Sequence, residues 1–324
     1  MDQLVRLITS RTGISEEAAR QGIGPSLAYI VRSRELRETM LLIVVAGSAE
    51  EYIKRNKPSL ELTIAKYYET MTTSASYSSY FLPVRFHDFY TRLKSAGGSP
   101  CAIYSGLNPM TGEDRPAGPR TPEQKGYPYL PGGVPRTGTE NPVEFLGLAV
   151  FRGDKMVGTL DSDETRAVAI LQGRFDRGAV GVVDPLKPEK DIINVNVRLD
   201  RKPKITADLK GGAPVFSVRV DLDADIRGVS SGINYEAPGY RELLEAQIAN
   251  LFAGQIARMI KHTQELDVDP VGFGLYLRPK FRTTVELKEA DLPALYRAAD
   301  IRVAVAVRVR RTELLWRVSP AGKQ

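Results

Sequence analysis

Catalysis by a serine or cysteine nucleophile needs a base within reach, and this sequence offers few bases. It contains two histidines, His87 and His262, far apart in the chain and each within a helix-like pattern, and one cysteine, Cys101, in an apolar run. One cysteine cannot form an internal disulfide, and so few ligands disfavour a Cys/His metal site. We therefore expect satisfied or solvated histidines and a buried thiol, with no catalytic, cofactor-binding or metal-binding residues.

Three aspartates, Asp221, Asp223 and Asp225, have the residue type that hard cations prefer. They alternate along a predicted strand, where residues two apart lie about 7 Å apart on one face and do not converge on one ion. We expect a solvated acidic face, paired with Lys204 or with an arginine of a neighbouring strand.

Two other patterns resemble ligand sites only in part. Residues 271–274, Val-Gly-Phe-Gly, lack the third glycine and the preceding strand of a dinucleotide-binding turn. The arginines near the C-terminus raise a nucleic-acid alternative; they are Arg302, Arg308, Arg310 and Arg311. No aromatic platform or basic helix accompanies them, so a charged outer face or a protected sheet edge is expected, and no nucleic-acid partner.

The composition is that of a globular protein. Of 324 residues, 42% are hydrophobic and 26% charged, and 45 basic residues against 39 acidic ones leave a net charge of +6. The length predicts two or three domains. The spread-out charge favours an anionic membrane surface or an acidic partner, or serves solubility alone. No apolar run reaches the roughly 18 to 20 residues of a membrane span, and residues 1–5 carry no signal for secretion.

The elements that must position these residues begin with alternating types. Strands are predicted at 4–8 and 39–46, and helices at 15–22, at 27–33 and after Ser48, where Glu51 has the capping-box spacing. Residues 60–96 predict two helices broken near 74–83, with Pro83 in the first turn of the second. Phe86, Phe89, Tyr90 and Leu93 form a stripe for core packing.

Residues 107–142 are rich in Pro, Gly and Thr, which predicts a long excursion, lid or linker. Its Tyr127 and Tyr129 fit either a docking motif or loosely held surface residues. A hairpin is predicted over 143–160, followed by a helix that Asp161 and Glu164 begin.

The C-terminal half alternates apolar and polar residues with period two, as antiparallel strands do. These strands are predicted at 193–199, 205–209, 216–226 and 301–309, with a helix of about thirty residues from Pro238 and a shorter one at 292–299 between the last two. The fold class is therefore α+β, with three mixed domains, the last an antiparallel sheet covered by a long helix and a shorter one. We place them at 1–57, an incomplete α/β unit, at 58–185 and at 186–320.

Residues 147–160, Gly-Leu-Ala-Val-Phe-Arg-Gly-Asp-Lys-Met-Val-Gly-Thr-Leu, followed by Glu-Thr-Arg-Ala at 164–167, resemble the middle signature of the spore germination protein C family, the Ger(x)C lipoproteins. Further matching pieces follow the family's order along nearly the whole chain. They are Ala46-Gly47, the alternating strands, the long helix ending in Gln264 and Asp267, 272–274, and 305–312 with Arg310-Arg311-Thr312.

The resemblance implies three α+β domains on the outer face of the spore inner membrane, held by a lipid on an N-terminal cysteine. It implies partnership with an A-type and a B-type subunit in a nutrient germinant receptor, and no enzymatic activity or cofactor. The family's leader and lipid-bearing cysteine have no counterpart in this sequence, and Cys101 is mid-chain. The tryptophan common in the family's late helix is also missing, with Leu295 and Tyr296 nearby.

Three functions are therefore compared. The first is a non-catalytic receptor subunit that works through protein–protein contacts in nutrient-triggered germination. The alternative is a small-molecule, nutrient-binding protein with an interdomain pocket, lidded by residues 107–142. A hydrolase is disfavoured because no acid, base and nucleophile can be assembled from the sequence.

Overall fold

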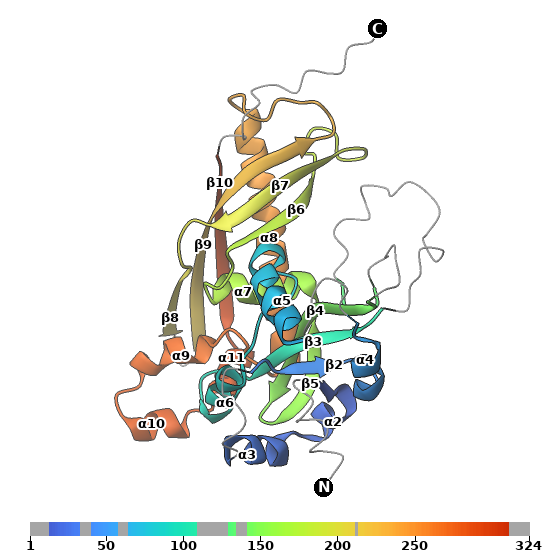
Figure 1. The fold of residues 1–324 in the computed structure, drawn as a ribbon. Coiled ribbons are helices and arrows are strands. Elements are labelled where there is room, and N and C mark those ends of the chain that lie inside the picture. Colours follow the sequence, from blue (N-terminus) through green and yellow to red (C-terminus); the bar gives the residue numbers. More distant parts are fainter. Residues whose placement is uncertain are drawn as a thin grey trace.

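The computed structural model describes residues 13–32, 40–57, 64–108, 129–133, 141–210 and 213–310. The strand predicted at 4–8, most of the excursion with Tyr127, and Arg311 lie outside them. Figure 1 shows two sheets, one near the N-terminus and one extending toward the C-terminus, with the long helix α8 beside the second. Among the described residues, no helix combines the length and apolar character needed to cross a bilayer.

The first sheet is mixed. Its strands lie in the order β1 (Gly13–Ser15), β2 (Ile43–Val45), β3 (Cys101–Leu107), β4 (Val143–Arg152) and β5 (Lys155–Leu160). The first two pairings are parallel, and the last two are antiparallel. All three residues of β2 are buried, as expected for a parallel strand covered on both faces. The hairpin predicted over 143–160 is confirmed.

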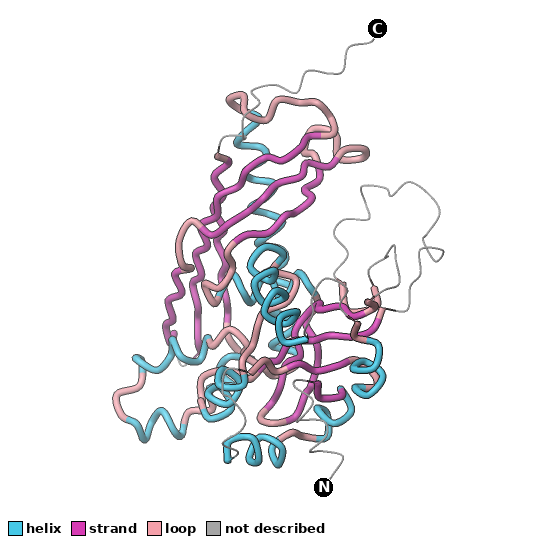
Figure 2. Tube along the Cα trace, in the orientation of Figure 1, coloured by secondary structure: helices cyan, strands magenta, loops and turns pink. Residues whose placement is uncertain are grey.

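Helices surround this sheet (Figure 2). They are α2 (Glu16–Gln21), α3 (Gly24–Arg32), α4 (Ala49–Arg55), α5 (Ile64–Ser78), α6 (Phe86–Lys94) and α7 (Ser162–Leu171). The Ser48 side chain accepts a hydrogen bond from the Glu51 N–H at 3.2 Å, which satisfies a free donor at the start of α4. At α7 the predicted cap is complete, because Asp161 and Glu164 each accept from the other's backbone N–H.

The placement of Pro83 in the first turn of a helix is wrong. Backbone hydrogen bonds join Leu42 N–H to the Val84 carbonyl and Phe86 N–H to the Met40 carbonyl. Residues 84 and 85 are therefore held extended beside Met40 and Leu42, and α6 begins only at Phe86. On α6 Phe86 and Phe89 are buried as predicted.

The second sheet has the order β10, β9, β7, β6, and β8 also pairs with β9. The bounds are β6 Arg177–Val183, β7 Ile192–Leu199, β8 Lys204–Lys210, β9 Ala213–Val229 and β10 Asp300–Val309. The expectation of a purely antiparallel sheet is wrong, because β10 runs parallel to β9 along ten paired positions from Asp300 to Val309. A helical crossover separates these two strands in the chain, and such a crossover returns the next strand in the same direction.

The crossover consists of α8 (Tyr240–Glu265), α9 (Phe273–Leu277), a 3₁₀ turn (Arg278–Lys280), α10 (Thr284–Glu289) and α11 (Leu292–Arg297). The apolar face predicted for the long helix is confirmed, except that Leu251 is only half-buried. Its buried members are Leu244, Ile248, Phe252, Ile256, Met259 and Ile260. The helix contacts β10 and, near its C-terminal end, α7. It therefore joins the second sheet to α7, the helix that directly follows the first sheet.

Strand β6 was not predicted. Its sequence, Arg-Gly-Ala-Val-Gly-Val-Val, places glycines at 178 and 181, which hide the alternation of apolar and polar side chains. The proposed division at residues 57 and 185 stays a prediction. Strand pairing shows that segments on both sides of residue 57 contribute to the first sheet.

Candidate functional site at the junction of helices α7 and α8

The structure does not bring the candidate reactive residues together. His87 lies on α6, where its ring nitrogen is 3.5 Å from the Thr91 hydroxyl, whereas His262 lies on α8 and contacts Glu164. Cys101 is buried in β3, and burial raises the pKa of its thiol, which disfavours the reactive thiolate. The predictions of a buried cysteine and a satisfied His262 are confirmed.

Asp223 lies on the central strand β9, opposite Arg198 of β7 and Arg308 of β10. Its carboxylate is within 3.3 Å of Arg308 and 2.8 Å of Arg310, and 3.7 Å from Arg198. Pairing with arginines of neighbouring strands was predicted and is confirmed. The expectation of a solvated face is wrong for Asp223, which is buried, because strands on both sides bring side chains over it.

The glycines at 272 and 274 serve a tight turn. The buried Asp269 carboxylate accepts hydrogen bonds from the Gly272 N–H at 2.7 Å and the Gly274 N–H at 2.9 Å. Gly272 has φ +93°, and a Cβ on Gly274 would lie 3.1 Å from backbone atoms of Gly97. This close approach of two backbones explains the glycine pattern without a cofactor.

Sequence reasoning missed the site at the junction of α7 and α8. From α8, Arg258 reaches Asp161 at 3.4 Å, Asp163 at 3.7 Å and Glu164 at 3.9 Å. One turn later, His262 Nδ1 lies 2.9 Å from Glu164 Oε1. Arg258 and His262 are four residues apart, which places both on one face of α8, and this spacing was the only indication of the site in the sequence. The fold is needed to show that this face meets the start of α7.

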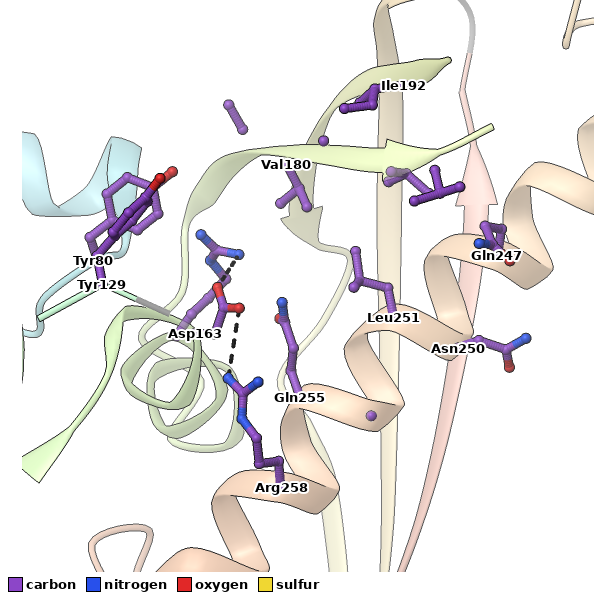
Figure 3. Close-up of a pocket in the computed structure, with 16 residues that line it drawn as sticks. Tyr80, Tyr129, Asp163, Val180, Ile192, Gln247, Asn250, Leu251, Gln255 and Arg258 are labelled. Atoms are coloured by element: carbon purple, nitrogen blue, oxygen red, sulfur yellow. Dashed lines mark ion pairs between the residues drawn. The ribbon is translucent and has the colours of Figure 1, made fainter. Parts of the chain in front are cut away.

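Beside these ion pairs lies a cavity of about 480 Å³, here called the junction cavity. It is lined by Asp163 and Arg166 of α7, by positions 179–183 of β6, by Ile192, by α8 side chains between Gln247 and Arg258, and by Tyr80 and Tyr129. Figure 3 shows Leu251 and Gln255 rising from α8 toward the strand that carries Val180, with Asp163 facing Arg258. The consecutive elements α7 and β6 therefore enclose one space together with α8, which lies far along the chain.

The carboxylates at this junction are held in a poorly solvated place. Burial raises the pKa of Asp163, and burial together with the Asp161 charge raises the pKa of Glu164. The Arg166 side chain is 3% exposed, lies 3.5 Å from Asp163 and covers the Tyr80 ring at 5.2 Å. The arrangement can bind polar or charged groups, and it presents no nucleophile with an adjacent base.

Comparison with known protein families gives two matches along the chain. Residues 13–105 match the spore germination protein N-terminal domain, and residues 146–313 match the spore germination B3/GerAC-like C-terminal family. The chain belongs to this GerAC-like family of spore germination proteins.

The chain is similar to spore germination protein B3 of Bacillus subtilis (strain 168), with 21% identity over 266 residues. That match covers 80% of this chain and 61% of the relative, so the chain spans less than two thirds of it. The fold is similar to the crystal structure of the GerBC protein, with a TM-score of 0.64 and 15% identity. The similarity covers 92% of this chain and 78% of that one.

In this GerAC-like protein the signature at 147–160 forms most of the β4–β5 hairpin, and 164–167 lies in α7. Gly147 has φ +91°, and a Cβ there would lie 2.4 Å from the Leu160 carbonyl oxygen, so the hairpin needs glycine at this position. The hairpin delivers the chain directly to the Asp161 cap. The signature therefore positions Glu164 and Arg166 at the junction.

Proposed function

We propose that this chain is a non-catalytic subunit of a nutrient germinant receptor, acting in spore germination through contacts with A-type and B-type subunits. The observation that carries the proposal is the family match over residues 146–313, joined by the N-terminal match over 13–105. A fold similar to the GerBC protein supports the same assignment.

The disposition of charges supports a role without catalysis. The strongest clusters of acidic and basic residues are engaged in ion pairs that join elements of the fold, as with Asp223 and its arginines or Glu164 and His262.

We place the protein at the outer surface of the spore inner membrane, attached by an N-terminal lipid of the kind its family carries. Co-expression of the full-length protein with A-type and B-type subunits tests the proposal. The expected result is co-purification of all three from detergent-solubilised membranes, while an unrelated lipoprotein with the same anchor does not co-purify. Recovery of the protein without either subunit would contradict it.

The nutrient-binding alternative is favoured by one feature, the junction cavity with its charged and amide side chains. A ligand site is compatible with partner contacts, because the cavity occupies a small part of the surface. Both roles can belong to the same subunit.

A further inference from the structure

The junction cavity contains two polar atoms that no other described group satisfies. Nε of Arg166 and Oε1 of Gln255 are both buried and have no hydrogen-bond partner among the described residues. The residues are 2% and 8% exposed. Unpaired buried polar atoms are rare in folded proteins, because each loses its contact with water without compensation. One is a donor on α7 and the other an acceptor on α8, so they call for a group or molecule that both accepts and donates.

The charged groups of the cavity are close together but loosely paired. Asp163 lies 3.5 Å from Arg166 and 3.7 Å from Arg258, and the remaining contacts of Arg258 with carboxylates are 3.4 Å or longer. Tight charge-assisted hydrogen bonds are about 2.7 to 2.9 Å long. Each charge therefore retains capacity for a further partner. The Arg258 side chain is 45% exposed and can reach a molecule entering from solvent.

Part of the remaining wall is apolar, and the amide side chains of Gln247 and Asn250 also line the cavity. Val182 is buried and Val180 and Leu251 are half-buried, and all three line the cavity from β6 and α8. In Figure 3 the labelled Val180 and Leu251 lie on opposite sides of the space above Gln255. A ligand that fits both walls has a charged end and an aliphatic end. The volume of about 480 Å³ lies in the range of small-molecule sites.

We propose that the junction cavity binds a small aliphatic zwitterion, a molecule with a carboxylate and an ammonium group on one carbon and a branched hydrocarbon side chain. The carboxylate accepts hydrogen bonds from Arg166 Nε and from Arg258. The ammonium group donates to Gln255 Oε1 and Asp163. The side chain lies against Val180 and Leu251. This inference rests on the nutrient-binding alternative above, for which it names the ligand class, and it does not rest on contacts with receptor partners.

Two other occupants fit part of the evidence. A single water molecule can accept from Arg166 Nε and donate to Gln255 Oε1, and a neutral polyol can do the same. Neither uses the loosely paired charge of Arg258 or the apolar side chains of the wall. The zwitterion uses all three features, so we prefer it.

Calorimetric titration of the whole 324-residue chain tests the proposal. The probe is L-leucine, compared with 4-methylpentanoate, which lacks the ammonium group, with 3-methylbutylamine, which lacks the carboxylate, and with myo-inositol. L-leucine is expected to bind. The two fragments, 4-methylpentanoate and 3-methylbutylamine, are expected to bind at least about tenfold more weakly, because a buried charged group then loses its partner. Equal binding of a fragment, binding of myo-inositol alone, or no heat with any probe would overturn the proposal.

Variants locate the site. Gln255→Met keeps the length of the side chain and removes the acceptor, and it should weaken L-leucine binding about tenfold. Lys261→Met, on the exposed part of α8 and outside the cavity, should leave it unchanged. Thermal unfolding without ligand checks that the Gln255→Met and Lys261→Met proteins are folded. Arg258→Met provides a second test of the site at an exposed position. Unchanged binding in folded Gln255→Met and Arg258→Met proteins would place the ligand elsewhere and refute the site. These measurements involve no receptor partner, so their failure leaves the receptor role untouched.

Discussion

His262 Nδ1 lies 2.9 Å from Glu164 Oε1, although the two residues are 98 positions apart in the chain. The Glu164 side chain is 6% exposed and that of His262 36%. Glu164 also accepts a hydrogen bond from the backbone N–H of Asp161, so one carboxylate both caps α7 and links it to α8. The contact therefore connects the helix that follows the signature hairpin with the helix that covers the second sheet.

His262→Phe should destabilise the protein by about 1–2 kcal/mol at pH 7, because Glu164 loses a charge-assisted partner in a poorly solvated place. Urea unfolding of both proteins measures the difference. His87→Phe is the control, since His87 is exposed, and it should change the stability by less than about 0.5 kcal/mol. Equal effects of the two substitutions would contradict the link.

The effect of His262→Phe on stability should also depend on pH. Burial raises the folded-state pKa of Glu164 above its ordinary value near 4.5, so the folded state holds this proton more strongly. The resulting contribution of Glu164 to the free energy of unfolding is present below the ordinary pKa, and it is lost as the pH rises through the folded-state pKa. His262 opposes this loss by stabilising the ionised carboxylate. The difference between wild type and His262→Phe should therefore be smallest near pH 4 and grow toward pH 7, as urea unfolding at several pH values can show.

Asp223→Asn should lower the free energy of unfolding by about 2–4 kcal/mol. The substitution removes the charge of a buried carboxylate that faces Arg198, Arg308 and Arg310, so three cations then lie together without it. Burial alone would raise the pKa of Asp223, but hydrogen bonds from Arg310 and Arg308 hold it below its ordinary value of 3.8. This stabilisation is present above 3.8 and is lost as the pH falls through the lowered pKa. Chemical unfolding from pH 7 to pH 2 measures both effects.

The control for Asp223 is Asp300→Asn on β10. Asp300 pairs with Arg302, but both side chains are more than half exposed. Exposed pairs contribute about 0–1 kcal/mol. A loss at Asp300 as large as that at Asp223 would show that burial does not set the strength of these pairs.

Asp269→Ala should cost about 2–4 kcal/mol, because the N–H groups of Gly272 and Gly274 lose their charged acceptor inside the protein. Asp291→Ala removes an acceptor for the Ala294 N–H at an exposed helix start and should cost about 1 kcal/mol. Thermal unfolding ranks the two. Hydrogen exchange at Gly272 and Gly274 should quicken only in the Asp269 variant, and unchanged exchange there would argue against the proposed bonds.

Gly147→Ala should destabilise the hairpin strongly, by more than about 2 kcal/mol, since the new Cβ would lie 2.4 Å from the Leu160 carbonyl oxygen. Gly153→Ala, in the turn of the same hairpin, has a positive φ of +60° but no atom within 4 Å of the new Cβ. It should cost only about 1–2 kcal/mol, the penalty of the left-handed conformation. Denaturant unfolding distinguishes them, and equal costs would mean that φ alone matters.

Much of the fold could be read from local patterns. The period-two alternation in 193–226 and 301–309 and the apolar stripe of the long helix each reflect one face turned to a core, and the structure confirms these elements. The direction of β10 could not be read, because a strand has the same alternation whichever way it runs. Strand β6 was not predicted because Gly178 and Gly181 have no side chains and so interrupt the alternating pattern.

The sequence by itself determined most of the element types, the Asp161–Glu164 cap and the family signature, because these depend on residues a few positions apart. Only the tertiary structure decided that Arg258 and His262 meet the start of α7, that Asp223 is buried between two strands, and that Arg166 and Gln255 share one cavity. The physical reason is that burial and hydrogen bonding at these sites arise between segments far apart in the chain, up to 98 positions for Glu164 and His262. Local periodicity specifies which face of an element is apolar, and it contains no information about which other element covers that face.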